Sequence, residues 1–224
     1  MNFKKDFWEK KIIGWENGRY AFEKTNLSTL ENVSDKLSSS LIFRQKFAIE
    51  LLKPVIKGAK VVELGCGSGL LTQTVFDLGC AHYTGYDISE NAIKRAKDLV
   101  SNRSIAKNVE YFASDVSEIK NNNPDIVFSL GLLDWLNNDE IKKIFLKFDN
   151  SKHLHSISEN RKFNIYIFMH KLYVYLSYGF KSNGYKPTYH SKTDIEKLYY
   201  NKKYNTIRAF RDKKLKFGAF IKNY

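Results

Sequence analysis

The middle of the chain alternates short apolar runs with stretches of mixed apolar and polar residues. The apolar runs predict five strands, at Lys60–Leu64, His82–Ser89, Val109–Val116, Asp125–Leu133 and Lys152–Glu159. Between them, apolar residues recur at helical spacing over about residues 70–78, 90–102 and 138–148. Strands that alternate with helices in this way favour a parallel sheet covered by helices on both faces.

Both ends of the chain depart from this alternation. Residues 1–33 predict an amphipathic helical region, and a second helix is predicted over Leu41–Val55. At the other end, residues 204–212 and 214–223 are rich in β-forming residues and are joined by a turn-like Asp-Lys-Lys. We expect these two runs to form a hairpin that finishes the sheet antiparallel.

The segment between the fifth strand and the hairpin is an aromatic-rich insertion over residues 161–190. It contains a predicted helix over residues 162–179, and a further helix begins just after His190. We expect this insertion and the N-terminal helices to form an aromatic lid over a modest pocket.

A glycine-rich loop follows the first strand, in the sequence VVELGCGSGLLT. Gly65, Gly67 and Gly69 let the backbone approach a ligand, and the next helix presents free N–H groups to an anionic group. A tight turn without a ligand needs only one glycine, so the spacing favours a cofactor loop. A dinucleotide loop would carry its third glycine where this chain has Leu70. Asp87, at the end of the second strand, suits ribose hydroxyls in either cofactor class.

Four stretches resemble, in order and spacing, the motifs of class I S-adenosylmethionine-dependent methyltransferases of the small-molecule or glycan type. VVELGCGSG resembles the first motif, GYDIS the second with its ribose-binding acid, FASDV the third, and DIVFSLGLLDWL the fourth. The resemblance covers roughly Leu41–Glu159, and KLKFGAFIKN resembles the last antiparallel strand of the family. It implies a Rossmann-like α/β fold: a doubly wound, mostly parallel seven-stranded sheet with a C-terminal antiparallel hairpin and N-terminal lid helices.

The resemblance also sets the expected division of the chain. We expect a single methyltransferase domain over residues 1–224. Its parts would be the N-terminal lid helices (1–57), the cofactor-binding core (58–159), the lid insertion (160–191), and the C-terminal helix and hairpin (192–224).

The cofactor that the resemblance implies is S-adenosylmethionine. The glycine loop would pass under its methionine part, and Glu63 would organise the loop or reach the cofactor's amino group through water. Asp87 would hold the ribose, and Asp115 would meet the adenine amino group, although its position also fits a helix cap. The expected cofactor-binding residues are Tyr20, Arg44, Glu63, Gly65, Cys66, Gly67, Asp87, Ile88, Asp115, Val116 and Ser129.

The N-terminal helix has three interpretations. In many relatives such a helix closes over the cofactor with an aromatic residue, here Tyr20 or Trp15, while Arg44 on the next helix would bind the methionine carboxylate. Plain helix packing accounts for the same residues. The third interpretation is an interfacial helix that lays Phe3, Phe7 and Trp8 into an anionic membrane.

Methyl transfer to an oxygen usually requires a base that removes the acceptor's proton. His190, which precedes the helix after the insertion, is the first choice, with Tyr189 beside it. Asp134 and Glu159 are further candidates at the same rim. Each also fits a structural role, Asp134 as a helix cap and Glu159 in an ion pair.

The remaining histidines are interpreted as structural. His155 lies inside the fifth strand, and His82 begins a strand far from the rim. His170 shares a helical stripe with Tyr166 and Tyr173, which favours core or lid packing over substrate contact. No metal is proposed, because the acids and histidine of the metal-dependent relatives are not present around Asp134.

Charge and composition leave the partner open. The formal net charge is +13 and the pI is about 9.5, which allows a polyanionic partner. The lysines are dispersed, however, and a compositional bias towards Lys, Asn, Ile and Tyr explains the charge equally well. No apolar run approaches the roughly 20 residues of a membrane span. The N-terminus has no signal-peptide features, and the two cysteines have no metal-type spacing, so we expect a cytoplasmic protein.

The leading hypothesis is O-methylation of a small molecule or glycan, with an anionic acceptor allowed by the charge. An RNA or DNA methyltransferase is the second hypothesis. Against it, the chain lacks both the Asn/Asp-Pro-Pro-aromatic pattern of base-amino methylation and any Pro-Cys dipeptide. A protein-methylating enzyme and a non-catalytic cofactor-binding subunit stay open.

Overall fold

A computed structural model describes residues 3–19, 42–120, 122–161, 165–178 and 185–224 of the chain. The side chains of residues 13–19, 173 and 176–178 are not part of this description. Tyr20, Trp15 and Tyr173, to which the sequence analysis gave roles, therefore lie outside it in whole or in their side chains.

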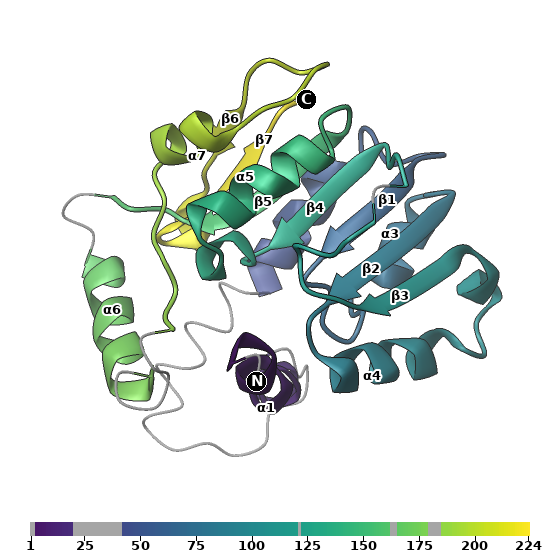
Figure 1. Ribbon diagram of the computed structural model, residues 1–224, viewed down its shortest axis with the longest axis horizontal. Helices are drawn as coiled ribbons and strands as arrows, with labels where there is room; N and C mark the ends of the chain where they lie inside the picture. Colours follow the sequence, from purple (N-terminus) through teal and green to yellow (C-terminus); the bar gives the residue numbers. More distant parts are fainter. Residues whose placement is uncertain (1–2, 20–41, 121, 162–164, 179–184) are drawn as a thin grey trace.

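The centre of the fold is a seven-stranded sheet in the order β3-β2-β1-β4-β5-β7-β6 (Figure 1). This confirms the predicted sheet. All pairs among the first five strands are parallel, and the order reverses at β1, which pairs with both β2 and β4. Ligands of such sheets bind beyond the carboxyl ends of the strands at this reversal. The five parallel strands are β1 (Lys60–Leu64), β2 (His82–Asp87), β3 (Val109–Ala113), β4 (Ile126–Leu130) and β5 (Lys152–Ser158).

The predicted C-terminal hairpin is confirmed. Strand β7 (Gly218–Lys222) lies antiparallel between β5 and the short β6 (Arg208–Phe210). The connection is longer than the predicted Asp-Lys-Lys turn, because a 3₁₀ turn, η3 (Lys213–Leu215), is followed by Lys216 in a left-handed conformation with φ +57°.

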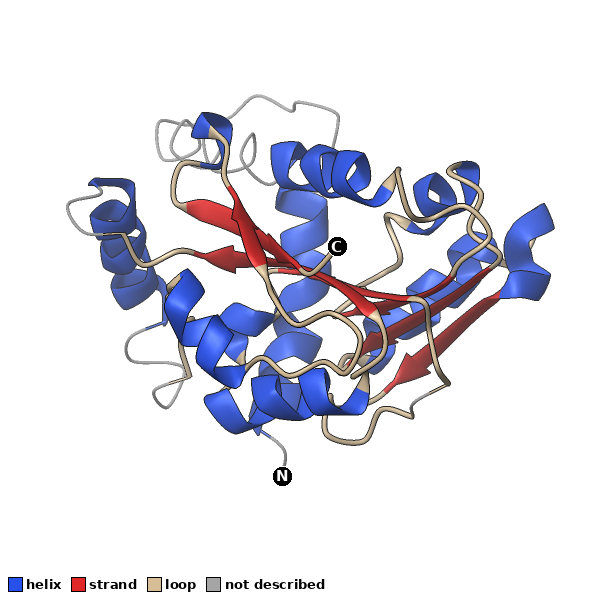
Figure 2. Ribbon diagram, turned by 90° about the horizontal axis from the view of Figure 1, so that it is seen from above, coloured by secondary structure: helices blue, strands red, loops and turns tan. Residues whose placement is uncertain are grey.

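Helices cover both faces of the sheet (Figure 2). On one face, the helix of residues 42–52 packs with α3 (Thr72–Asp77) and α4 (Glu90–Val100) over a core that includes Phe128 and Phe220. On the other face, α5 (Asn138–Lys147) and α7 (Lys192–Leu198) pack over a second apolar core around Val62 and Val127. Short 3₁₀ helices, η1 (Ser104–Asn108) and η2 (Leu133–Trp135), complete the connections.

Strands β2 and β4 end earlier than the runs predicted for them, for local reasons. Ser89 leaves β2 because its hydroxyl accepts the backbone N–H of Ala92 at 3.1 Å and caps α4, as its residue type predicts. The run after β4 ends at Gly131, whose φ of +78° turns the chain before η2 begins. Both turns lie at the carboxyl ends of the strands.

Two helices lie outside the sheet layers. α1 (Phe3–Arg19) lies near the carboxyl ends of the strands, and Lys4 and Lys5 form ion pairs with Glu140 of α5 and Glu90 of α4. α6 (Ile165–Tyr178), within the predicted insertion, stands at the side of the molecule (Figure 1). A search of the described helices finds none with the length and apolarity needed to cross a membrane.

Candidate functional site

A cavity of about 240 Å³ opens at the carboxyl ends of β1, β2 and β4, where the strand order reverses. The glycine loop, the ends of β2 and β3 and the helix of residues 42–52 line one half of it. The rest of the lining comes from η2, α6, the segment of residues 185–187 and α1, which also contacts the start of α4 through the Lys5–Glu90 ion pair. Cofactor-type residues and an apolar compartment therefore share one space.

The glycine loop leaves β1 with its three glycines in left-handed conformations. The φ angles of Gly65, Gly67 and Gly69 are +71°, +54° and +71°, a region in which other residue types are strained. The N–H groups of Gly65 and Cys66 donate to the carbonyl of Tyr86 at 2.7 and 3.0 Å. The loop is thus fixed against the end of β2, and Gly65, Cys66 and Gly67 all line the cavity.

Asp87 ties the glycine loop to the start of α4. Its Oδ2 accepts the N–H of Gly67 at 2.9 Å, and its Oδ1 accepts the N–H of Ser89 at 2.9 Å. The carboxylate lies at the end of β2 and lines the cavity. Each carboxylate oxygen has further lone pairs, so the same group can accept hydroxyl protons from a ligand.

Glu63 is buried beneath the loop, only 4% exposed, and still contacts the cavity. The hydroxyl of Tyr83 donates a short hydrogen bond to its Oε2. Burial raises the pKa of Glu63 to about 8, with a smaller contribution of the same sign from the charge of Asp87 and an opposing one from the Tyr83 hydrogen bond. At pH 7 the carboxyl group is therefore mostly protonated.

Gly85 in β2 is required for packing under the loop, and the sequence analysis missed it. A Cβ at this position would lie 2.7 Å from the Tyr111 ring and 2.8 Å from the sulfur of Cys66. Tyr111 also shares a hydrogen bond of 2.5 Å with Thr72 at the start of α3. An isolated glycine inside a strand pattern was the available signal, since it marks close approach of a neighbouring group.

Arg44 reaches the cavity from the helix of residues 42–52. Its Nη1 lies so close to Gly131 that a Cβ there would be 2.8 Å away. Its Nε is buried and has no hydrogen-bond partner within the described structure. A buried guanidinium N–H without an acceptor is costly, so this position suits an anionic ligand group.

Asp115 lies in the turn after β3 and lines the cavity with its neighbour Val116. Its Oδ1 accepts the N–H of Ser117 at 2.9 Å and the Ser117 hydroxyl at 2.8 Å. The carboxylate therefore caps a turn. The sequence analysis had considered a helix cap as the alternative to an adenine contact. Ile88 completes the predicted residues that line this half.

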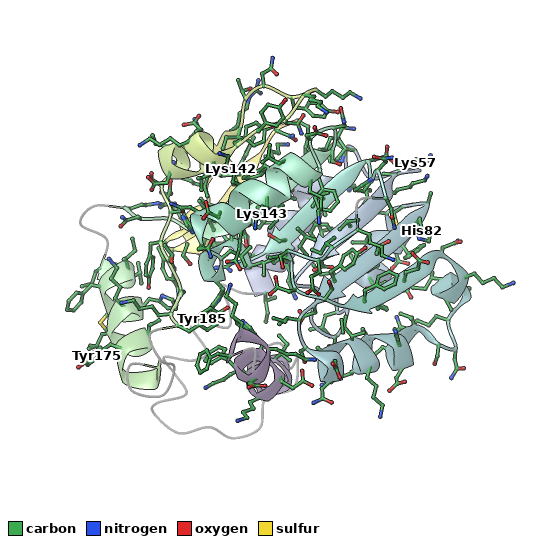
Figure 3. The ribbon with its side chains drawn as sticks, viewed as in Figure 1. Lys57, His82, Lys142, Lys143, Tyr175 and Tyr185 are labelled. Carbon is green, nitrogen blue, oxygen red and sulfur yellow. The ribbon has the colours of Figure 1, made fainter. Side chains whose placement is uncertain are left out.

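The other half of the cavity lies under an aromatic cluster. Trp8 of α1 and Trp135 of η2 have ring centroids 4.8 Å apart, and the Trp8 Nε1–H donates to the hydroxyl of Tyr185 at 3.0 Å. Phe7 packs on Trp135 and on Tyr185, which lies between α1 and α6 in Figure 3. Phe7 and Trp8 are thus engaged within the protein, which disfavours the membrane-inserting interpretation of α1.

Asp134 lines this half but is held by Ser158 at the end of β5. Its Oδ1 accepts the Ser158 N–H at 2.8 Å, and its Oδ2 accepts the Ser158 hydroxyl at 2.7 Å. Burial raises the pKa of Asp134 above its ordinary value, against the opposing charge of Arg44 and the Ser158 hydrogen bonds. The carboxyl group therefore joins η2 to β5 at the cavity wall.

His170 of α6, which the sequence analysis interpreted as a core or lid residue, lines the cavity. Its Nδ1 lies 2.6 Å from the hydroxyl oxygen of Tyr189, and its ring packs on Phe217 with centroids 4.9 Å apart. Burial, together with the charge of Asp134, raises the pKa of Tyr189 above its ordinary value. Tyr189, a predicted catalytic residue, therefore contacts His170 and is not itself among the described residues that line the cavity.

His190 is placed away from the cavity, so its predicted location is corrected. It is 3% exposed, its Nε2 lies 3.2 Å from the carbonyl oxygen of Leu133, and its backbone N–H donates to the Ser158 carbonyl. A short parallel bridge with Glu159 fixes this geometry. The ring therefore supports the chain at η2, and it is not among the described residues that line the cavity.

Glu159 also lies outside the cavity lining, in an ion-pair cluster. Its carboxylate is bound by Arg211, through Nε at 2.9 and 2.8 Å, and by the Nε of Arg161 at 2.5 Å. Burial alone would raise the pKa of Glu159, but the hydrogen bonds from Arg211 and Arg161 outweigh it and hold the pKa below its ordinary value. This is the ion-pair alternative of the sequence analysis.

Ser129 belongs to a buried hydrogen-bond chain on the α5 face and is not part of the described cavity lining. Its Oγ lies 2.9 Å from His155 Nδ1, and His155 Nε2 lies 3.1 Å from His153 Nδ1. His153 Nε2 lies 3.0 Å from the Phe148 carbonyl oxygen. Burial lowers the pKa of His153 to about 4. The chain is therefore neutral, and Ser129 has a structural position.

Within the described residues, no group of three or more His, Cys, Asp or Glu side chains could hold a metal ion. The strand order, the glycine loop at its reversal point and the acid at the end of β2 define a Rossmann-like domain for a nucleoside-containing cofactor.

Comparison with known proteins finds a family match over part of the chain. Residues 61–151 match the sequence model of a family described as a methyltransferase domain. Together with the fold, this match shows that the chain carries a class I S-adenosylmethionine-dependent methyltransferase domain. The family resemblance seen in the sequence is confirmed.

Two curated relatives match parts of the chain. The ribosomal protein L11 methyltransferase of Caldanaerobacter subterraneus subsp. tengcongensis is 34% identical over 83 residues, 37% of this chain and 26% of that protein. Phosphoethanolamine N-methyltransferase 1 of Triticum aestivum is 30% identical over 114 residues, 49% of this chain and 22% of that protein. The chain thus spans about a quarter of the length of these relatives.

The fold is similar to solved structures over nearly its whole length. Magnesium protoporphyrin IX methyltransferase from Synechocystis PCC 6803, with bound SAH, aligns with a TM-score of 0.70 at 14% identity. The alignment covers 98% of this chain and 96% of that one. At this identity the likeness concerns the fold alone.

Proposed function

We propose that the protein is an S-adenosylmethionine-dependent O-methyltransferase whose acceptor is a small, largely apolar molecule with an ionisable hydroxyl or carboxyl group. The observation that carries this proposal is the single cavity, which joins the glycine loop to an aromatic compartment containing His170. Our proposal narrows the small-molecule or glycan class expected from the sequence, because apolar and aromatic side chains dominate the second half.

The residues present fit the cofactor. The left-handed glycines bring backbone close to the cavity, where Asp87 would accept the two ribose hydroxyls. Arg44, with its orphaned Nε, would bind the carboxylate of the methionine part, and Glu63 would lie near its amino group. When bound, S-adenosylmethionine would supply the methyl group, whose bond to sulfur breaks with its electron pair on sulfur as the acceptor atom bonds to carbon.

The chain's own contribution would be positioning and proton removal. Trp8, Trp135 and Tyr185 would exclude water and hold a flat or apolar acceptor in line with the methyl group. In the tautomer with its proton on Nδ1, His170 donates to the Tyr189 oxygen and offers the Nε2 lone pair as the base for the acceptor. Asp134, held by Ser158, would shape the wall without taking the proton.

Acceptor class and acceptor atom are tested together in one assay. The full chain is incubated with S-adenosylmethionine carrying tritium in its methyl group and a panel of phenols, aromatic carboxylic acids, sugars, amines and total RNA. We expect label in the phenol or carboxylic acid products. Label that enters only amines, sugars or RNA would overturn the proposed acceptor class while leaving the methyltransferase domain in place.

The nucleic-acid alternative receives its main support from the net charge of +13. Against it stands the position of α1, whose Trp8 lines the cavity and packs with Phe7 on Trp135. An extruded base would have to displace this aromatic cluster. We therefore favour a small acceptor.

A further inference from the structure

Helix α6 exposes a broad apolar surface next to the acceptor compartment. The exposed large side chains on this helix are Ile165 (64%), Tyr166 (51%), Phe168 (62%), Met169 (51%), Leu172 (43%) and Tyr175 (59%). Single exposed apolar residues are common on proteins, whereas a contiguous group usually marks an interaction surface. In Figure 3, Tyr175 points away from the body of the protein.

The exposed residues form one side of the helix. At about 100° per residue, Phe168, Leu172 and Ile165 fall together on the outer half. Ile167 and Val174, 4% and 8% exposed, fall on the opposite side with His170. The inner side of α6 thus lines the acceptor compartment while its outer side is apolar and exposed. We call this outer side the α6 face.

The sequence of the insertion that contains α6 carries charge of one sign. The 34 residues from 160 to 193 contain no Asp or Glu but six Lys or Arg residues, although acids make up 24 of the 224 residues of the chain. Lys171 and Lys216 lie at the margins of the face, with Nζ atoms 5.0 Å from the Tyr189 ring centroid and 5.7 Å from the Tyr166 ring centroid. Lysines beside exposed aromatic and aliphatic residues complement an anionic, apolar partner.

We propose that the α6 face docks the protein on the surface of an anionic lipid bilayer. Fourteen helical residues extend about 21 Å, which is too short for a hydrocarbon core of roughly 30 Å, so α6 would lie in the interface and not cross it. Apolar side chains would enter the acyl boundary, and the lysines would contact lipid phosphates. The membrane role considered for α1 in the sequence analysis thus belongs to α6.

This docking goes beyond the proposed methyl transfer and complements it. Because α6 carries His170 and Val174 on the wall of the acceptor compartment, docking would place that compartment at the lipid boundary. An apolar acceptor dissolved in the bilayer could then enter without crossing water. Vesicle binding is measured without any acceptor, so its failure and the failure of the proposed activity are separate results.

The test is co-sedimentation of the full chain with vesicles of phosphatidylcholine and phosphatidylglycerol in equal parts, beside vesicles of phosphatidylcholine alone. We expect binding to the anionic vesicles only, weakened by salt. The double variant Phe168→Gln, Leu172→Gln should bind at least about tenfold more weakly. The matched control Leu99→Gln, Leu146→Gln replaces exposed leucines of α4 and α5, 40% and 46% exposed, and should bind like the wild type.

Three results would overturn the proposal. The first is absence of wild-type binding to the anionic vesicles. The second is equal binding by the α6 variant and the control, with both variants folded by circular dichroism. The third is a wild-type oligomer in light scattering that the α6 variant alone abolishes, since the α6 face would then be a protein–protein interface.

Discussion

The Nδ1 atom of His170 lies 2.6 Å from the hydroxyl oxygen of Tyr189, a residue 19 positions further along the insertion. This pair joins α6 to the chain just before α7 and places a titratable ring at the acceptor half of the cavity. Tyr189 is therefore a positioning residue in our account, and His170 is the proposed base.

The first prediction concerns this pair. We expect His170→Gln to lower kcat about 100-fold or more, because no group at that position would accept the proton, whereas Tyr189→Phe should cost roughly tenfold by loosening the ring. Single-turnover methyl transfer to an acceptor found in the tritium panel measures both. His82→Gln, at the partly exposed start of β2, is the matched control. Full turnover by His170→Gln would remove it as the base.

The second prediction follows from the raised pKa of Glu63. At pH 7 its carboxyl group is mostly protonated, because its pKa is about 8. A bound ammonium group favours the ionised form, so cofactor binding near pH 7 should release up to one proton. Affinity should rise with pH towards about 8 and fall above it, where the cofactor's free amino group loses its proton. Calorimetry in two buffers of different ionisation enthalpy measures the proton. Glu63→Gln should release none.

The third prediction concerns Gly85. Gly85→Ala would press a methyl group against the Tyr111 ring and the Cys66 sulfur, both within 2.8 Å. We expect a loss of about 1 to 3 kcal/mol in the free energy of unfolding, measured with urea. Gly218→Ala, whose Cβ would lie 3.3 Å from the nearest atom, should cost less. Equal losses for the two variants would contradict the packing described for Gly85.

The fourth prediction concerns acid stability. The folded pKa of His153 is about 4, below the value of about 6.5 for an unfolded histidine, because the ring is buried. Its contribution to stability is therefore complete above pH 6.5 and is lost as the pH falls towards 4. The loss should reach about 3 kcal/mol for His153 alone. NMR titration of its Cε1 proton tests this, and a midpoint near 6.5 in the folded protein would contradict it.

Much of the fold could be predicted because it depends on local patterns. Strand β1 was predicted with its observed bounds, because an apolar run followed by glycines is compatible with few structures other than a buried strand and a loop. The cap at Ser89 follows in the same way from residue type. The doubly wound sheet of seven strands was predicted from the family resemblance. Its strand order comes from the structure, because periodicity does not say which strands are neighbours.

The acceptor side could not be predicted, for a physical reason. Apolar residues lie on every side of helix α6, so its pattern does not reveal that His170 faces inwards while Phe168 faces outwards. Likewise, the segment before His190 is polar, which is typical of sequence at the rim of a site. Its position is set by hydrogen bonds with the distant Leu133 and Ser158, which no local pattern encodes.

The most direct test of the account is calorimetric titration of the full chain with S-adenosylmethionine. We predict one site with a dissociation constant in the micromolar range. In Asp87→Asn the affinity should fall at least about tenfold, because the charged carboxylate that would accept the ribose hydroxyl protons is lost. Asp98→Asn, on the exposed side of α4, should bind like the wild type. Absence of binding at millimolar cofactor, or equal binding by the two variants, would contradict a cofactor site at the glycine loop.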